Sequence, residues 1–375
     1  MTHIHWLGAG LSSIPGIKRM ASNGHKFTVW NRTLAKAEKS INQIQSNEVS
    51  AKVLDLNQFT LTLKYGDIVV SQLSANLHLE IAKICLDKNC HFASSSYISP
   101  SLKELDKQAK DKNLIFINEI GLDPGIDHFF SHLLVEDLKK HKFENISVSY
   151  KSFCGGLSAV PNDFKYKFSW SPVGVIKALS NKSLFIDNYI KKKVTPYHHI
   201  NSYSVNNEIF EAYPNRDSLP YIEEYSFPSD WKIKNFIRGT LRLKGWGNAW
   251  QEIFAMLENP SLDLEKNINV KSDELWSRYQ YEKDEKDRVV LSVCLEAHNK
   301  NGKLWSGSYE LDEVGSGENS AMATLVSITL SAGIDLILKK KLNPGVQAAP
   351  KNKKNIDYFF KILKEYNINI KKNNE

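Results

Sequence analysis

The first 120 or so residues alternate short apolar runs with segments of helical periodicity, and this alternation restricts the fold more than any other feature. Short apolar runs bounded by helices are typical of buried parallel strands, since each helix carries the chain back to the same edge of the sheet. The sequence therefore predicts an α/β fold that begins with a Rossmann-type, doubly wound parallel sheet. Strands are expected at 3–7, 26–30, 67–71, 91–95 and 114–118, and helices at 33–45, 77–88 and 100–112.

The pattern changes after Asn118. Between 154 and 250, glycine, proline, asparagine and aromatic residues are frequent, which favours loops supported on a sheet, the usual place for binding groups. A chain of 375 residues is longer than one core usually holds, so two domains are expected. Helices are predicted at 126–140, 321–339 and 357–365, a strand at 145–153, and an antiparallel pair at 289–297 and 303–311.

Composition argues against several classes of protein. With 42% apolar and 24% charged residues, the chain resembles an ordinary globular protein, and no run reaches the roughly 18–20 consecutive apolar residues of a membrane helix. The first residues lack the basic and apolar regions of a signal peptide. Much of the net charge of +7 lies in short lysine runs, which favours solvated surface over a nucleic-acid site. The four cysteines form no C-x-x-C pair, which favours a reduced, cytoplasmic setting.

Neither a metal site nor a cysteine nucleophile is expected. His3 and His5 alternate on one strand, but we expect no carboxylate or cysteine to accompany them, and two adjacent histidines at 198–199 lack a third ligand. Cys154 lies beside two glycines but lacks the histidine–asparagine pattern that would activate it, so a packed thiol is expected.

A Gly8-Ala9-Gly10 turn directly follows the first predicted strand. The first glycine permits a tight turn, and the second lets the backbone approach a pyrophosphate at the positive end of the next helix. Ser13 stands where the third glycine of G-x-G-x-x-G would be, and it is small enough for close helix–strand packing. An ordinary strand–turn–helix would have the same spacing, so the assignment depends on the β/α context.

The end of the second predicted strand distinguishes two cofactors. An acidic residue there would bind the ribose 2′-OH of NAD, but this chain has Asn31-Arg32-Thr33. The Arg32 guanidinium suits a 2′-phosphate, which favours NADP over NAD, although it could also merely begin a solvated helix. Asp55 is expected near the adenine, and the stretch from Ser71 to Ser74 near the nicotinamide ribose.

Six further segments, together and in this order, closely resemble saccharopine reductase, the glutamate-forming saccharopine dehydrogenase family. The resemblance extends from residue 1 to about 350 and includes a G-x-G-x-x-x-x-P opening that ends at Pro15. The segments are Ser-Ser-Tyr-Ile-Ser-Pro at 95–100, Asn-Glu-Ile-Gly-Leu-Asp-Pro-Gly-Ile-Asp-His at 118–128, Cys-Gly-Gly-Leu at 154–157, Tyr-Lys-Phe-Ser-Trp-Ser-Pro at 166–172, Tyr-Pro-Asn-Arg-Asp-Ser at 213–218 and Arg-Gly-Thr-Leu-Arg at 238–242.

The resemblance implies a Rossmann domain at 1–122, an inserted α/β (α+β) substrate domain at 123–318, and a C-terminal helical segment at 319–375 that returns to the Rossmann domain. It also implies interconversion of saccharopine with glutamate and 2-aminoadipate 6-semialdehyde by means of a nicotinamide cofactor. With the spacing above, cofactor contacts are expected at Gly8, Ala9, Gly10, Leu11, Asn31, Arg32, Thr33, Asp55, Ser71, Ser95 and Ser96. Substrate contacts are expected at Ser96, Tyr97, Asp123, Arg216, Thr240, Leu241 and Arg242.

The chain departs from the family in three places. The helical insertion that follows the Arg-Gly-Thr-Leu-Arg segment is much shortened, and Ser-Ala-Val-Pro replaces Pro-Ala-Pro after Cys-Gly-Gly-Leu. The stretch 73–76 reads Leu-Ser-Ala-Asn where the family often has a Leu-Ile-Pro-Tyr-like sequence lining the cofactor cleft. These changes preserve the expected reaction class but affect the expected substrate.

The predicted chemistry needs cations and a proton acceptor. Saccharopine carries three carboxylates, which Arg216 and Arg242 could each grip with two parallel hydrogen bonds, whereas an isolated surface arginine would form only a weak ion pair. Asp123 follows a predicted strand and could take the amine proton, or it could be only a turn residue before Pro-Gly. Lys167 could bind a carboxylate or donate a proton, or be solvated, and Tyr97 could donate a hydrogen bond.

Two other functions fit the same residues. A related imine reductase could act on a carboxylated polyamine, although retention of Asp123 and Arg216 favours the tricarboxylate. A catalytically silent dinucleotide sensor is suggested by the altered cleft stretch. A small-molecule amino-acid substrate is the expected partner, with neither nucleic acid nor membrane, and the chain could form a homodimer.

Overall fold

The computed structural model describes residues 2–258 and 263–374, which form two compact units. Unit 1 comprises Met1–Phe129 and Met322–Asn367, and unit 2 comprises Phe130–Ala321 and Ile368–Glu375. The division therefore falls a few residues beyond the predicted boundaries at 122 and 318. The last residues, which we expected to lie with the Rossmann domain, belong to unit 2 because they add a strand to its sheet.

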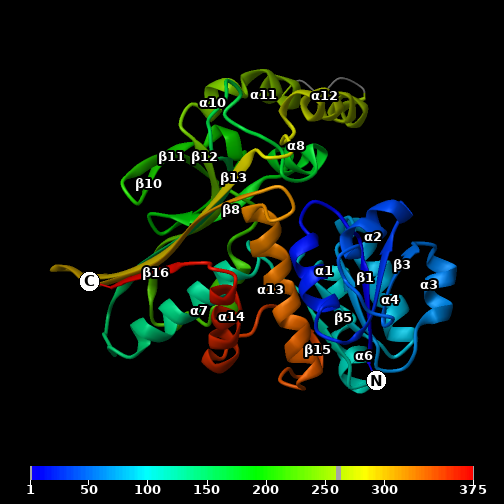
Figure 1. The fold of residues 1–375 in the computed structure, drawn as a ribbon. Coiled ribbons are helices and arrows are strands. Elements are labelled where there is room, and N and C mark those ends of the chain that lie inside the picture. The colour runs from blue at the N-terminus through cyan, green and yellow to red at the C-terminus, as the bar shows by residue number, and fades with distance from the viewer. Residues whose placement is uncertain (1, 259–262, 375) are drawn as a thin grey trace. The chain divides into compact units, whose positions relative to one another are not determined.

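Unit 1 is built on a seven-stranded parallel sheet, as the alternation of strands and helices predicts (Figure 1). Its order is β15-β6-β5-β4-β1-β2-β3, so the chain runs outward from β1 first in one direction and then in the other. The strands β4 and β6 are buried along their whole length, as expected of a sheet that is covered on both faces. The strands are β1 His3–Leu7, β2 Lys26–Asn31, β3 Val49–Val53, β4 Ile68–Ser71, β5 His91–Ser94, β6 Ile115–Ile117 and β15 Gly345–Gln347.

Two short helices of unit 1, α3 and α5, begin at a residue whose side chain caps them. Asp55 accepts a hydrogen bond from the backbone of Gln58 at the start of α3, and Ser99 does the same for Leu102 at the start of α5. The predicted helix at 100–112 is two helices, α5 and α6, rather than one. The bounds are α1 Ile14–Ala21, α2 Leu34–Ile41, α3 Leu56–Thr62, α4 His78–Asp87, α5 Pro100–Lys103, α6 Asp106–Asp111, α13 Ala321–Leu338 and α14 Lys353–Glu365.

The C-terminal segment completes unit 1 through α13, β15 and α14. Gly16 of α1 lies so close to α13 that its N–H donates to the Ser327 hydroxyl at 2.8 Å. The buried Asp335 of α13 pairs with Arg19 and accepts a hydrogen bond from Tyr358 of α14 at 2.7 Å. By length and hydropathy α13 could cross a membrane, but 83% of it is buried inside the protein, as in a core helix. The sequence prediction did not anticipate that any segment would reach this limit.

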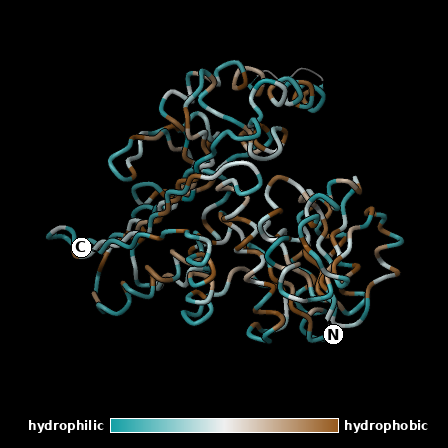
Figure 2. Tube along the Cα trace, viewed as in Figure 1, coloured by the Kyte–Doolittle hydropathy of each residue, from teal (hydrophilic) through white to brown (hydrophobic). Residues whose placement is uncertain are grey.

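Unit 2 is built on a nine-stranded mixed sheet. β13 and β14 form the predicted antiparallel pair. Figure 2, which colours the chain by hydropathy, shows that unit 2 contains both hydrophobic and hydrophilic segments. β7 pairs with β12 in parallel and with β13 in antiparallel orientation. The strands are β7 Ser147–Ser158, β8 Ser183–Asp187, β9 Ile190–Val194, β10 Asn201–Val205, β11 Glu208–Pro214, β12 Lys232–Leu243, β13 Lys286–Asn299, β14 Gly302–Ser316 and β16 Ile370–Asn374.

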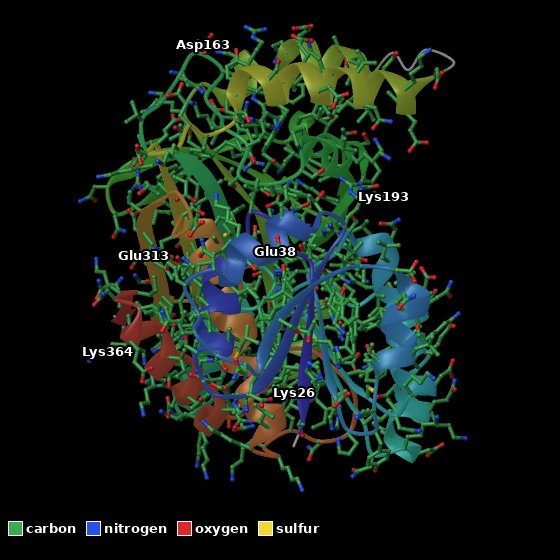
Figure 3. All side chains as sticks on the ribbon, turned by 45° about the vertical axis from the view of Figure 1, so that its right-hand side comes forward. Lys26, Glu38, Asp163, Lys193, Glu313 and Lys364 are labelled. Atoms are coloured by element: carbon green, nitrogen blue, oxygen red, sulfur yellow. The ribbon has the colours of Figure 1, made fainter. Side chains whose placement is uncertain are left out.

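Region 154–250 contains more regular structure than its composition indicates, including the twelve-residue strand β12. The helices at 172–180, 246–249, 251–258 and 264–279 pack an aromatic core in which Trp246 and Trp250 are fully buried. Most charged side chains are exposed, among them the labelled Asp163 of unit 2 and Lys26 and Glu38 of unit 1 in Figure 3. The helices are α8 Pro172–Ser180, α9 Pro220–Glu224, α10 Trp246–Ala249, α11 Gln251–Glu258 and α12 Leu264–Tyr279, and α7 Ile126–Lys139 begins in unit 1 and ends in unit 2.

The packing of α1 against α13 predicts that adding one methyl group at Gly16 lowers the stability of the fold. In Gly16→Ala the added Cβ would lie 2.4 Å from the Ser327 carbonyl oxygen and 2.8 Å from the Trp6 ring. We expect the free energy of unfolding, measured by denaturant titration, to fall by about 1–3 kcal/mol. Gly10→Ala is the matched control, since its Cβ meets nothing within 4 Å and should change stability by less than about 0.5 kcal/mol. Equal stabilities for the two variants would contradict this packing.

Candidate active site

The turn after β1 has the backbone that a phosphate-binding loop needs. Gly8 has φ +101°, and a Cβ there would lie 2.7 Å from the Gln72 carbonyl oxygen. Gly10 is exposed, and a Cβ built on it meets nothing within 4 Å. The first glycine is therefore required by the turn, while the second leaves room for a ligand beside the N-terminus of α1. These residues fit the pyrophosphate of a dinucleotide.

Close helix packing behind this turn depends on Gly16 as well as on the small, buried Ser13. Ser13 is buried at the N-cap of α1 without a side-chain capping bond. Gly16, one turn later, is the residue whose missing side chain lets α1 approach Trp6 and Ser327. Sequence reasoning assigned this role to Ser13 because it counted glycines from the family spacing. The Pro15-Gly16 dipeptide, with proline in the first turn, was the available signal.

At the end of β2, Asn31 supports the glycine turn, whereas the next two residues are exposed. Asn31 accepts a hydrogen bond from the Ala9 N–H at 3.2 Å and donates to the Thr33 carbonyl at 3.0 Å, so it holds the glycine turn. Arg32 and Thr33 are exposed, and within the described ranges no hydrogen bond or ion pair engages the Arg32 guanidinium. Arg32 is therefore free to bind a phosphate, and Leu11 is 57% exposed.

Asp55 has a structural role that the cofactor prediction did not include. Its Oδ1 accepts a hydrogen bond from the Gln58 N–H at 2.8 Å and caps α3. Capping explains an acidic residue at this position without a ligand. The contact of Asp55 with adenine stays a prediction.

A polar network occupies the carboxyl ends of β4 and β5. Gln72 donates to Ser95 Oγ at 2.9 Å. His78 Nδ1 lies 2.9 Å from Ser71 Oγ, and its Nε2 lies 2.8 Å from Ser96 Oγ. Burial lowers the pKa of His78 to about 4, so the ring is neutral near pH 7. The sequence prediction included the three serines and, within the stretch 71–74, Gln72. It missed His78, which also follows a strand at the edge where α/β sheets bind ligands.

The segment 118–128 closes into a tight loop. Gly121 donates its N–H to the Pro124 carbonyl at 2.9 Å, and Gly125, at φ +147°, packs against Gly121 so closely that a Cβ would lie 2.2 Å from its carbonyl oxygen. The buried Asp127 accepts from the Gly125 N–H at 2.7 Å. Its carboxylate therefore closes the loop as well as lying in the first turn of α7.

Glu119 and His128 lie near the two ends of this segment and contact each other. The buried Glu119 carboxylate accepts from the Ile98 N–H at 2.8 Å and lies 2.9 Å from His128 Nε2. It thereby ties the segment after β6 to the segment after β5. Sequence reasoning identified this stretch as a family motif without these internal roles.

Two predicted catalytic residues meet within unit 1. Tyr97, after β5, donates its hydroxyl hydrogen to Asp123 Oδ1 at 2.8 Å. Asp123 is half-buried, whereas the residues around it in the loop are buried. The carboxylate therefore has a partner from another segment of the sheet edge, while its role as a proton acceptor stays a prediction.

The predicted cations of unit 2 differ in their surroundings. Lys167 is mostly buried and forms an ion pair with Glu285 at 2.5 Å, so it is not a solvated lysine. Glu285 was not among the predicted residues. Arg216 is exposed in the turn after β11, where it adopts φ +59°. Its backbone carbonyl accepts from the Leu184 N–H at 2.9 Å, which fixes the turn.

Arg242 is a buried cation in an aromatic cage. It is 6% exposed, and its guanidinium lies 4.8 Å from the ring centre of Tyr166 and 5.5 Å from those of Tyr213 and Trp246. Among the residues that the structure describes, Nε has no hydrogen-bond partner and no carboxylate forms an ion pair with the guanidinium. Glu211, opposite on β11, instead accepts from two backbone N–H groups. A buried charge without a counter-charge is costly, so this site favours an anion.

The neighbours of Arg242 on β12 face opposite ways. Thr240 shares its face and is half-buried. Leu241 is fully buried in an apolar cluster on the other face, so any contact it makes with substrate would come from its backbone. Its carbonyl accepts a hydrogen bond from Arg242 at 3.1 Å.

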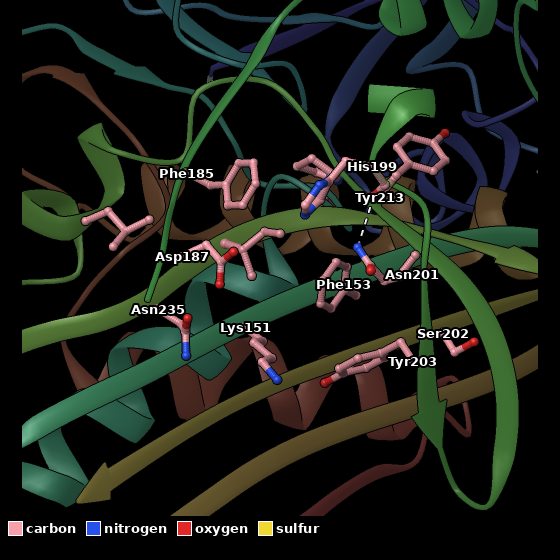
Figure 4. Close-up of a pocket in the computed structure, with 14 residues that line it drawn as sticks. Lys151, Phe153, Phe185, Asp187, His199, Asn201, Ser202, Tyr203, Tyr213 and Asn235 are labelled. Carbon is pink, nitrogen blue, oxygen red and sulfur yellow. Dashed lines mark hydrogen bonds between the residues drawn. The ribbon is translucent and has the colours of Figure 1, made fainter. Parts of the chain in front are cut away.

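A separate cavity of about 260 Å³ lies on the opposite face of this sheet (Figure 4). Its floor includes Lys151 and Ile237, which pair across β7 and β12. Because side chains alternate along a strand, Arg242 points away from this face. The predicted substrate residues therefore do not line this cavity.

One histidine prediction was wrong. His3 and His5 are accompanied by a carboxylate, because Asp67, the residue before β4, lies beside them. His5 Nε2 lies 3.4 Å from Asp67 Oδ2, while its Nδ1 accepts from the Trp30 indole N–H at 3.2 Å. An indole only donates, so the His5 proton lies on Nε2, which then has no lone pair for a metal. The cluster is a buried polar network.

The structure thus groups the candidate residues within each unit. In unit 1 the glycine turn, the serines and the Tyr97–Asp123 pair follow strands of one parallel sheet. In unit 2, Thr240 and Arg242 share a face of β12. The convergence of Asp123 with Arg216 stays a prediction, because they belong to different units.

A parallel sheet with a glycine turn after its first strand, followed by a unit that carries a buried cation, defines a dinucleotide-dependent oxidoreductase. Two sequence profiles match the chain: the saccharopine dehydrogenase NADP-binding domain over residues 4–117 and the saccharopine dehydrogenase C-terminal domain over 121–368. This chain belongs to the saccharopine dehydrogenase family, and its first unit is an NADP-binding domain.

Individual proteins agree with this assignment. Saccharopine dehydrogenase (NADP+, L-glutamate-forming) of Pyricularia oryzae is 30% identical over 450 aligned positions that cover 97% of each protein. An alignment longer than this chain requires gaps in it, which is consistent with a shortened insertion. The apo structure of saccharopine dehydrogenase (L-Glu forming) from Saccharomyces cerevisiae has the same fold, with a TM-score of 0.83, 24% identity and 100% coverage of both chains. The homospermidine synthase of Legionella pneumophila in complex with NAD shares the fold at a TM-score of 0.64 and 13% identity, with 99% and 91% coverage.

The exposed Arg32 predicts cofactor preference. Arg32→Asp removes the cation expected at the 2′-phosphate and adds a carboxylate that suits a free 2′-OH. We expect the NADP/NAD ratio of kcat/KM to fall by about 100-fold or more, since about 3 kcal/mol accompanies loss of a charged contact and gain of repulsion. Lys36→Asp, an exposed change of the same charge on α2, is the control. An unchanged ratio would show that Arg32 does not bind the phosphate.

Proposed function

We propose that this chain is an NADP-dependent, L-glutamate-forming saccharopine dehydrogenase of lysine metabolism. It oxidises the CH–NH bond of L-saccharopine and, with water, yields L-glutamate and 2-aminoadipate 6-semialdehyde, or runs in reverse. The observation that carries this proposal is the buried Arg242 guanidinium, which lacks a carboxylate partner among the described residues. The family membership and the NADP-binding domain support it.

Substrate binding would compensate the buried charge. A carboxylate of saccharopine can accept hydrogen bonds from Arg242, and the aromatic rings around it exclude water and so strengthen the attraction. Arg216, exposed on its turn, is proposed to grip a second carboxylate with two parallel hydrogen bonds. A tricarboxylate would use both cations, whereas a polyamine with fewer carboxylates would leave one unused.

The cofactor would be held by the glycine turn and by Arg32. When bound, NADP accepts the hydride that leaves the substrate carbon. Hydride loss requires an unprotonated amine. Asp123 is proposed to take the amine proton, with its carboxylate oriented by the Tyr97 hydroxyl. Water then adds to the resulting C=N bond. The C–N bond of the hydrated product breaks and releases glutamate, which carries the amine, and the semialdehyde.

Loss of the Arg242 charge tests the central observation. In Arg242→Met a flexible apolar side chain fills the aromatic cage without the cation. We expect kcat/KM for saccharopine, followed by NADPH absorbance, to fall by roughly 10–100-fold, the value of a charged hydrogen bond, while NADPH affinity is unchanged. Arg278→Met is the matched control, since Arg278 lies over Tyr279 but is exposed. Unchanged activity in Arg242→Met would remove the proposed carboxylate site.

Loss of the Asp123 charge tests the proton acceptor. Asp123→Asn keeps the size of the side chain but cannot take a proton, so we expect kcat to fall by roughly 10²–10⁴-fold. Tyr97→Phe, which loses only the orienting hydrogen bond, should cost less. A kcat equal to that of the wild type in Asp123→Asn would mean that another group accepts the proton.

The two alternatives predict different results in the same assay. A carboxylated-polyamine imine reductase would turn over the polyamine imine with a higher kcat/KM than saccharopine. A silent sensor would bind NADPH without turnover of either substrate. We favour saccharopine because Asp123 and Arg216 are retained.

Cellular location and assembly are further proposals. The free thiols of Cys85, Cys90, Cys154 and Cys294 support a reducing, cytoplasmic location, and fractionation of cells would test it. A homodimer is proposed, and light scattering on the purified chain would detect it.

A further inference from the structure

His78 connects two strand ends that sequence reasoning treated separately. It is the first residue of α4 and follows β4 after a short 3-10 turn, Ala75–Leu77. Its side chain therefore turns back over the carboxyl edge of the sheet, where it meets Ser71 at the end of β4 and Ser96 beyond β5. The ring is 6% exposed and packs edge-on against Phe92.

The surroundings of Ser71 determine which ring nitrogen carries the proton. Ser71 is fully buried, and among the described residues His78 is the hydrogen-bond partner of its hydroxyl. A buried hydroxyl hydrogen without an acceptor would be costly, so Ser71 donates to Nδ1. A neutral imidazole has one donor and one acceptor, so Nε2 carries the hydrogen and donates it to Ser96 Oγ.

This direction leaves the Ser96 hydroxyl hydrogen pointing elsewhere. The backbone of Ser96 is fixed on both sides, because its N–H donates to Ser94 Oγ at 3.0 Å and its carbonyl accepts from the Glu119 N–H at 3.1 Å. Its side chain is half-buried, and within residues 2–258 and 263–374 no acceptor binds its hydroxyl hydrogen. Ser96 therefore offers a hydrogen-bond donor at the edge of the sheet that also bears Tyr97 and Asp123.

We propose that His78 is a positioning residue: it fixes Ser96 as a hydrogen-bond donor to a carboxylate of the substrate. The inference rests on the proposed function, because it assigns the acceptor to saccharopine. His78 transfers no proton itself. A neutral ring held between two serines orients a hydroxyl, whereas a charged ring would donate to both and leave the Ser71 hydrogen unpaired.

The test is a double-mutant cycle on saccharopine affinity. Calorimetry would measure the Kd of saccharopine for the NADPH complex, which binds the substrate but cannot oxidise it. His78→Phe keeps the ring and its packing on Phe92 but removes both hydrogen bonds. We expect the Kd to rise by about 5–30-fold, which is part of the worth of one hydrogen bond to a charged group, because the Ser96 hydroxyl is kept but no longer oriented. NADPH affinity should be unchanged.

Coupling to Ser96 separates positioning from a general structural effect. In a Ser96→Ala background, His78→Phe should change the Kd by less than about 2-fold, because the hydroxyl that it orients is gone. His78→Gln, whose amide N–H can reach Ser96, should restore much of the affinity and also serves if His78→Phe does not fold. His91→Phe is the matched control, because His91 is a half-buried histidine with a lowered pKa at the other end of β5.

The outcomes are distinct. Equal losses for His78→Phe with and without Ser96 would overturn the proposal and leave a structural role alone. A loss in NADPH affinity that matches the loss in saccharopine affinity would also overturn it, because Ser96 would then serve the cofactor. Wild-type protein that binds NADPH but not saccharopine would refute the proposed substrate instead.

Discussion

Parallel pairing of β1, β4 and β5 is the constraint on which the site in unit 1 depends. The register aligns Leu7 with Ser71, and Ser71 with Ser94, so the three strands end at the same edge. The residues that follow must then share a small volume. Gly8 passes so close to the backbone of Gln72 that no side chain would fit there. The segments after β4 and β5 are joined through His78. The glycine turn and the serine network are two consequences of one alignment.

A second feature is the use of buried polar groups to fix loops rather than to stabilise the core. Glu119 and Asp127 accept backbone N–H groups at places where no strand provides a partner. They leave Asp123 half-buried, where it accepts a hydrogen bond from the Tyr97 hydroxyl. In unit 2 the aromatic cage around Arg242 keeps a cation away from water without neutralising it. The buried cation costs stability by itself, which is typical of a site that gains its partner when a ligand binds.

Sequence reasoning predicted the periodic parts of the fold and the residues carried by family motifs. The alternation of strands and helices, the β13–β14 pair and the long apolar helix α13 follow from local patterns, and the structure has them. What it missed depends on contacts between distant segments. Gly16 matters because of Ser327, Asp67 joins His3 and His5 across two strands, and Lys167 is paired with Glu285. The short strand β15, which adds the C-terminal segment to the sheet, and β16 at the far end of the chain have too little periodicity to be recognised.

The most direct test of the whole account is a crystal structure of this chain with NADPH and saccharopine bound. The account predicts the pyrophosphate at Gly8–Gly10, a substrate carboxylate on the Arg242 guanidinium, and the secondary amine within hydrogen-bond distance of Asp123. A structure in which saccharopine binds without contacting Arg242, or in which its amine lies far from Asp123, would contradict it.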